Sequence, residues 1–137
     1  MSALDPAQRH GVFIVDDNES VCALLTEYLG TEPGLSVCGS ATSGADALEK
    51  IPASTCELAL VDVSLGGGMS GIALVRHLRK AAPTVRCLML SAHSGGAFLA
   101  AALSAGAWGY VEKGDPDALL AEVHRVLELA TLDRLHY

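Results

Sequence analysis

The sequence predicts an α/β fold built on a doubly wound parallel sheet, and three observations support this prediction. Short apolar runs of strand length alternate with segments whose apolar residues recur at helical spacing. These runs are continuous rather than alternating, which is typical of strands covered by helices on both faces. Polar or charged residues follow most of the runs, and open α/β sheets bind ligands at the carboxyl ends of their strands. We therefore expect a functional site at that edge.

Five strands are expected. The apolar run over residues 58–61 has the character of a strand buried on both faces, and it ends abruptly on the carboxylate of Asp62. A charge at the end of a buried strand is unfavourable unless it has a partner or a function. The predicted strands cover residues 12–15, 35–39, 58–61, 86–90 and 108–111.

Five helices should connect and cover these strands, with right-handed crossovers. The side chains of Asp16-Asp17-Asn18 suit the N-cap of the first helix, Ser43 suits that of the second, and Asp115 before Pro116 suits that of the last. The helix expected over residues 95–106 consists mostly of glycine and alanine around few large side chains. Because its propensity is weak at the start and its anchors are few, we expect this helix to be mobile.

Length, composition and charge limit the classes of protein to consider. The 137 residues suit one domain. No apolar run approaches the roughly 18 residues that cross a bilayer, and the N-terminus lacks the segments of a signal peptide, so we expect a cytoplasmic protein without membrane contact. The net charge of −7 argues against nucleic-acid binding by this domain and suits a cation site better.

The cysteines and most histidines are expected to be structural or exposed. The four cysteines lie far apart and form no CxxC pair, which favours core packing over a disulfide or metal ligation. They are Cys22, Cys38, Cys56 and Cys87. The scattered histidines are expected at the surface, and they are His10, His77, His124 and His136.

The ends of the predicted strands should bring together Asp16, Asp17 and Asp62 with the hydroxyl of Ser91 and the ammonium of Lys113. Three carboxylates repel one another, and a hard divalent cation such as Mg²⁺ relieves that repulsion. A Mg²⁺ ion, an ammonium and a hydroxyl together can neutralise charge on a phosphoryl group, and a carboxylate can be the nucleophile. The predicted chemistry is phosphoryl transfer.

In combination, the motifs at the strand ends closely resemble the receiver domain of two-component response regulators. The motifs are Val-Asp-Asp at residues 15–17, Val-Asp-Val at 61–63, Leu-Ser-Ala at 90–92 and Gly-Tyr-Val-Glu-Lys at 109–113. The resemblance implies a flavodoxin-like five-stranded sheet of order 2-1-3-4-5 in a three-layer sandwich. It spans about residues 11–130, which leaves a leader over 1–10 and a tail, or an extension of the last helix, over 131–137.

The resemblance implies the roles of the acidic residues. Asp62 would accept the phosphoryl group from a sensor histidine kinase or a phosphotransfer protein. Asp17 and Asp62 would bind Mg²⁺ together with the backbone carbonyl of Ser64, and Asp16 would act through a metal-bound water. The domain would be a signalling module rather than an enzyme, with only self-catalysed phosphotransfer and slow autodephosphorylation.

The resemblance also implies how the signal would leave the site. Lys113 would pair with the phosphoryl group, Ser91 would hydrogen-bond one of its oxygens, and Tyr110 would rotate inward when Ser91 moves. The helix over 95–106, the fifth strand and the last helix would form the output face, through which a homodimer could also form. The alternative for Tyr110 is half-buried packing on an edge strand, and the switch role is favoured. His93 could influence the attacking water or be an exposed loop residue.

Two features depart from the usual pattern of the family. The loop before the glycine that opens the third helix is one residue longer and contains Gly66-Gly67-Gly68. Gly114 follows Lys113, where many receivers have a proline in a cis bond, and this resembles the DNA-binding LuxR-type regulators. We expect the Lys113-Gly114 peptide bond to be trans, because a cis bond before a residue other than proline costs about 2.5 to 4 kcal/mol.

Two other functions compete with this interpretation. One is a metal-dependent phosphohydrolase with an aspartate nucleophile, and the other is a receiver-like module that binds partners without being phosphorylated. Haloacid-dehalogenase-like hydrolases carry two aspartates separated by one residue and have a cap segment, whereas here Asp16 and Asp17 are adjacent and no cap segment is evident. Taken singly, these two aspartates could also be helix caps.

Overall fold

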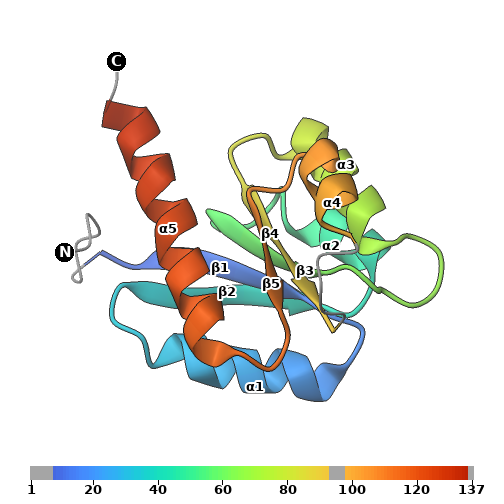
Figure 1. Ribbon diagram of the computed structural model, residues 1–137, viewed down its shortest axis with the longest axis horizontal. Coiled ribbons are helices and arrows are strands. Elements are labelled where there is room, and N and C mark those ends of the chain that lie inside the picture. Colours follow the sequence, from blue (N-terminus) through green and yellow to red (C-terminus); the bar gives the residue numbers. More distant parts are fainter. Residues whose placement is uncertain (1–7, 93–97, 136–137) are drawn as a thin grey trace.

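The computed structural model describes residues 8–92 and 98–135 and forms a three-layer sandwich (Figure 1). Five parallel strands form one sheet in the order β2-β1-β3-β4-β5, which confirms the predicted fold class and strand order. The strands are β1 (His10–Val15), β2 (Leu35–Ala41), β3 (Leu58–Asp62), β4 (Arg86–Ser91) and β5 (Gly109–Glu112).

Five helices alternate with the strands and cover both faces of the sheet (Figure 1). They are α1 (Glu19–Gly30), α2 (Gly44–Lys50), α3 (Gly71–Ala81), α4 (Leu99–Ala105) and α5 (Pro116–Leu135). Side chains cap four of them, three as the sequence predicts and the fourth, on α3, in addition, because these short polar groups accept hydrogen bonds from otherwise unpaired N–H groups. The capping residues are Asn18, Ser43, Ser70 and Asp115. Within the described ranges, no helix combines the length and apolar character needed to span a membrane.

The core consists of two apolar clusters, one on each face of the sheet. Successive side chains of a strand point to opposite faces, so β3 contributes to both clusters. Leu58 and Leu60 pack with α1 and α5, whereas Ala59 and Val61 pack with α2, α3 and α4. Every residue of β3 is buried, as the continuous apolar run predicts. The strand that ends in Asp62 is therefore held rigidly from both sides.

Helix α4 has few anchors in the core. It has seven residues, and its buried side chains are only the small ones of Ala102 and Ala105. No side chain of a described residue caps its first turn, while Gly106, at φ 116°, ends it in the left-handed conformation. Residues 95–97 of the predicted helix lie outside the described residues. The expected shortage of anchors is confirmed.

Three features differ from expectation or extend it. β1 begins at His10, inside the predicted leader, and His10 is 7% exposed with Nδ1 2.9 Å from Oε2 of Glu57. The prediction that His10 is exposed is therefore wrong, because pairing of β1 with β2 begins at this residue. α5 continues to Leu135, so the last helix includes most of the predicted tail. The peptide bonds that the structure describes are trans, including the one before Gly114.

All four cysteines are free, in agreement with a packing role. Three are buried, and Cys38 is half-buried. Burial is the main cause that raises the pKa of Cys38 to about 11 and that of Cys87 to about 12. Both thiols therefore remain protonated at neutral pH.

Gly71 should be essential for the junction between β3 and α3. A Cβ atom at this position would overlap the backbone carbonyl of Asp62, whereas a Cβ at Gly30 in α1 would meet nothing within 4 Å. We expect Gly71→Ala to lower the free energy of unfolding by about 1 to 3 kcal/mol or more, because backbone must shift to accommodate the methyl group. Gly30→Ala is the matched control and should be neutral or stabilising by up to about 1 kcal/mol. Urea denaturation measures both, and equal stability of the two variants would contradict the prediction.

Candidate functional site

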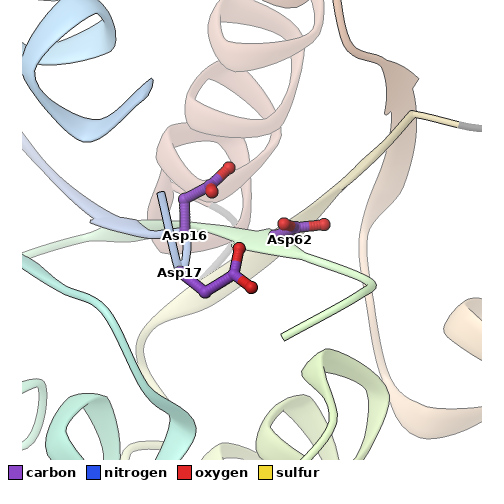
Figure 2. A group of neighbouring side chains, drawn as sticks. All are labelled: Asp16, Asp17 and Asp62. Carbon is purple, nitrogen blue, oxygen red and sulfur yellow. The ribbon is translucent and has the colours of Figure 1, made fainter. Parts of the chain in front are cut away.

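Three aspartates lie together at the carboxyl ends of two adjacent strands (Figure 2). Asp16 and Asp17 directly follow β1, and Asp62 is the last residue of β3. One carboxylate oxygen from each aspartate lies within 4.8 Å of the corresponding oxygens of the other two. The structure therefore brings together the three carboxylates that the sequence predicts, at separations that one bound cation could bridge.

Local turns hold the two buried carboxylates. Asp16 is 0% exposed and Asp62 is 4% exposed. Each accepts a hydrogen bond from the backbone N–H two residues later, at 2.9 Å: Asn18 donates to Oδ1 of Asp16, and Ser64 donates to Oδ1 of Asp62. Such turns are typical of aspartate at the end of a strand. Because Asn18 caps α1, the alternative that Asp16 or Asp17 is the helix cap is not supported.

Asp17 has a different environment from the two buried aspartates. Its side chain is exposed, and its Oδ2 accepts a hydrogen bond of 3.2 Å from the backbone N–H of Gly66 in the loop between β3 and α3. This bond connects the end of β1 to the loop that follows Asp62. Sequence reasoning did not identify this contact, although the run of three glycines was a signal that the backbone approaches something closely there.

Lys113 supplies the positive charge that the aspartates need. Its Nζ lies 2.6 Å from Oδ2 of Asp16 and 3.0 Å from Oδ2 of Asp62. The backbone N–H of Lys113 donates to the carbonyl of Ser91, at 2.7 Å, which continues the pairing of β5 with β4 beyond the strand end. Burial lowers the pKa of Lys113, but its hydrogen bonds to Asp16 and Asp62 more than offset this, so the pKa is raised. The ammonium therefore stays charged at neutral pH.

The charge on Asp62 is only partly compensated. Burial raises the pKa of this carboxyl, and the hydrogen bonds from Lys113 and from the N–H of Ser64 oppose the shift without cancelling it. The neighbouring charge of Asp16 raises the pKa further. One ammonium thus serves two buried carboxylates, and the site favours an additional positive charge.

Ser91 and Tyr110 lie where the sequence predicts them. Ser91 ends β4 and is 1% exposed, one residue beyond Leu90, which is the partner of Asp62 in the sheet. Tyr110 lies on the edge strand β5, is half-buried and packs against the core cluster of α2, α3 and α4. Its hydroxyl is buried and has no hydrogen-bond partner among the described residues. His93 lies outside the described residues.

Cys22 is a supporting residue that sequence reasoning assigned only to the core. Its thiol donates to the backbone carbonyl of Asp16 at 3.3 Å, so α1 contacts the backbone of the acidic site. No signal in the sequence distinguishes this cysteine from the other buried ones. The backbone N–H of Ser64 is fixed by Asp62, and the role of its carbonyl as a metal ligand remains a prediction.

Comparison with known proteins identifies the family. Residues 12–124 match the response regulator receiver domain. The chain is 42% identical over 102 residues to the DNA-binding transcriptional activator DevR/DosR of Mycobacterium tuberculosis, covering 74% of this chain and 46% of that protein. It is 36% identical over 116 residues to the transcriptional regulatory protein UhpA of Escherichia coli, covering 84% and 57%. The chain thus spans about half the length of these curated relatives.

Solved structures agree with this match. A LuxR-family two-component response regulator from Aurantimonas sp. aligns with a TM-score of 0.82 at 30% identity, covering 88% of this chain and 86% of that one. A CheY-like receiver domain protein from Methanospirillum hungatei aligns with a TM-score of 0.82 at 25% identity, covering 92% and 99%. The family match disfavours the phosphohydrolase alternative. From β1 into α5, the chain belongs to the receiver domains of two-component response regulators, which are signalling domains rather than classical enzymes.

Proposed function

We propose that this receiver domain accepts a phosphoryl group on Asp62 from a sensor histidine kinase or a phosphotransfer protein, in a Mg²⁺-dependent reaction. The observation that carries the proposal is the group of three carboxylates with oxygens within 4.8 Å of one another, beside a lysine whose Nζ contacts two of them. Asp62 is the best candidate acceptor because it ends the central strand and is held by both Ser64 and Lys113.

The ligand set fits Mg²⁺, since it consists of oxygen atoms and leaves room for water and phosphate oxygens. We assign direct ligation to Asp17, Asp62 and the backbone carbonyl of Ser64. Asp16 is fully buried and is already paired with Lys113, so it would act through a water. When bound, Mg²⁺ would stabilise the negative charge on the oxygens of the transferred phosphoryl group.

The residues of the chain perform the remaining tasks. A carboxylate oxygen of Asp62 forms a bond to phosphorus while the bond between phosphorus and the histidine nitrogen of the donor breaks. Lys113 exchanges its contact with Asp62 for a phosphoryl oxygen, so its charge stays compensated. Ser91, at the end of the neighbouring strand, donates its hydroxyl to another phosphoryl oxygen.

An apolar groove beside Lys113 suits a helix of the phosphodonor. It lies between α1 and the start of α5, and Leu24, on the exposed side of α1, is 67% exposed. A donor helix in this groove would bury such apolar side chains. Lys113, which also lines the groove, would then face the phosphorylated histidine of the donor. This placement would bring the donor to the carboxyl ends of the strands.

We further propose that phosphorylation acts through α4, β5 and α5, the face that could also support a homodimer. Helix α4 has few anchors and Tyr110 has a buried hydroxyl without a partner in the described part of the chain, so both can change position at low cost. The proposed receiver domain covers residues 11–130. Its phosphorylation shifts the population between two conformations of this face, to the extent that the phosphorylated site fits one of them better.

Phosphorylation should occur at one aspartate. With Mg²⁺ and either the cognate kinase or acetyl phosphate, intact mass should show one added phosphoryl group on the native protein and none on Asp62→Asn or in EDTA. Asp115→Asn is the matched control, because asparagine caps α5 as well as aspartate does, and it should be phosphorylated normally. A phosphoryl group on another aspartate of Asp62→Asn, or none on the native protein with its kinase, would refute the assignment.

The proposed output face can be tested by hydrogen exchange. Adding Mg²⁺ and beryllofluoride, a mimic of the phosphoryl group, should change protection in β4, α4 and β5. Ser91→Ala should weaken the change, since it removes the hydroxyl that would link the mimic to β4. Ser40→Ala, on the exposed side of β2, is the control and should leave the change intact. Unaltered exchange with the mimic demonstrably bound would leave Asp62 an acceptor without a switch.

The charge of Asp62 should make stability depend on pH in the metal-free protein. Because its folded-state pKa is raised, Asp62 stabilises the fold below its unfolded pKa, and this contribution is lost as pH rises through the folded pKa. Asp62→Asn cannot ionise, so it should become more stable relative to the native protein as pH rises from 3 to 7. Urea denaturation in EDTA measures this difference. Mg²⁺ at 100 times its Kd should then raise the free energy of unfolding of the native protein by about 2.7 kcal/mol, and the same concentration should raise that of the variant by less.

A further inference from the structure

The loop between β3 and α3 is attached at its ends and loose in its middle. At one end, the N–H of Gly66 donates to Oδ2 of Asp17. In the middle, Gly67 and Gly68 have φ values of 67° and 68°, and an added Cβ at either would meet nothing within 4 Å. No side chain packs there to order the backbone, and two glycines lose much conformational freedom when they are ordered. The order of the loop must therefore come from its two ends.

Met69 forms the second attachment. Its side chain is half-buried and packs against the core cluster on the α2, α3 and α4 face. It also lies against Gly44, the first residue of α2, so closely that an added Cβ there would be 2.9 Å from Cβ of Met69 and 3.1 Å from its Cγ and Sδ. The absence of a side chain at Gly44 makes room for Met69. The start of α2 thus holds the far end of the loop.

We propose that this loop is a strap that positions Asp17, and that Met69 is the positioning residue that sets the affinity of the acidic site for Mg²⁺. The inference rests on the proposed function, in which Asp17 is a metal ligand. With the loop attached, Gly66 holds Oδ2 of Asp17, and the carboxylate keeps an oxygen within 4.8 Å of oxygens of Asp16 and Asp62. With the loop detached, Asp17 is an exposed side chain free to change rotamer, and binding must also order it.

Attachment of the loop and affinity for Mg²⁺ are related quantitatively. The apparent Kd equals the intrinsic Kd divided by the fraction of molecules with the loop attached. Packing of Met69 on Gly44 raises that fraction, and the two flexible glycines lower it. Changes at either place should therefore alter Mg²⁺ affinity, although neither place supplies a ligand. A contact at the start of α2 is in this way coupled to a metal site at the ends of β1 and β3.

The first test truncates the anchor. Met69→Ala should raise the Kd for Mg²⁺, measured by calorimetry, by about fivefold or more, whereas Met69→Leu keeps the apolar volume and should stay within about twofold. Gly44→Ala should also weaken binding, because its methyl group displaces Met69. In the double variant Gly44→Ala/Met69→Ala, the loss of binding free energy for Mg²⁺ should be smaller than the sum of the two single losses, because truncation of Met69 makes room for the methyl group.

The second test changes only the backbone preference of the strap. Asparagine tolerates the left-handed conformation and valine does not, and a Cβ atom at Gly68 would meet nothing within 4 Å. Gly68→Asn should bind Mg²⁺ as tightly as the native protein or more tightly, and Gly68→Val should bind it more weakly. If the loop contributed only to folding, the folded forms of these two variants would bind Mg²⁺ with the same Kd.

A metal-free measurement distinguishes failure of the strap proposal from failure of the proposed function. In EDTA, the ¹⁵N order parameter of the Gly66 amide should fall in Met69→Ala and in Gly68→Val, and stay unchanged in Met69→Leu. If the native protein binds Mg²⁺ and these variants bind it equally well, the strap proposal is wrong and the proposed function stands. If the native protein binds no Mg²⁺, the proposed function fails at its metal site, and the strap proposal fails with it.

Discussion

The interaction on which the site depends is the contact of one ammonium with two buried carboxylates. Lys113 lies within 3.0 Å of both Asp16 and Asp62, and a third carboxylate, Asp17, lies at the solvent side of the same group. Three negative charges face one positive charge in a partly desolvated place, and attraction and repulsion are both stronger there than in water. β1 and β3, which lead to the two buried carboxylates, are buried along their whole length.

The sheet order explains why this cluster exists. β1 and β3 are neighbours, so the carboxylates that follow them meet, and β5 reaches the cluster only through the extended pairing of Lys113 with Ser91. The two strands that carry the acids are buried, whereas the strand that carries the lysine is at the edge. The two buried acids, Asp16 and Asp62, are held more rigidly than Lys113. This arrangement suits a site whose charge changes, because the adjustable lysine can follow the change.

The loop after β3 and helix α4 are both loosely packed. Gly67 and Gly68 have open space around them, and α4 buries only two alanines. By contrast, β1, β3 and β4 contain no exposed residue. A local change in charge can therefore be transmitted by these loosely held segments without disturbing the fold, since locally weak elements rearrange at the lowest cost.

The sequence by itself determined the strands, the sheet order through the family resemblance, and the five polar positions at the strand ends, because apolar periodicity and strand-end chemistry are local patterns. Only the tertiary structure decided that His10 is buried against Glu57, that Gly66 holds Asp17, and that Met69 occupies the space left at Gly44. Each of these contacts joins segments that are distant in the chain. Their geometry follows from how β1, β3 and α2 pack together, and no local pattern of residues encodes that packing.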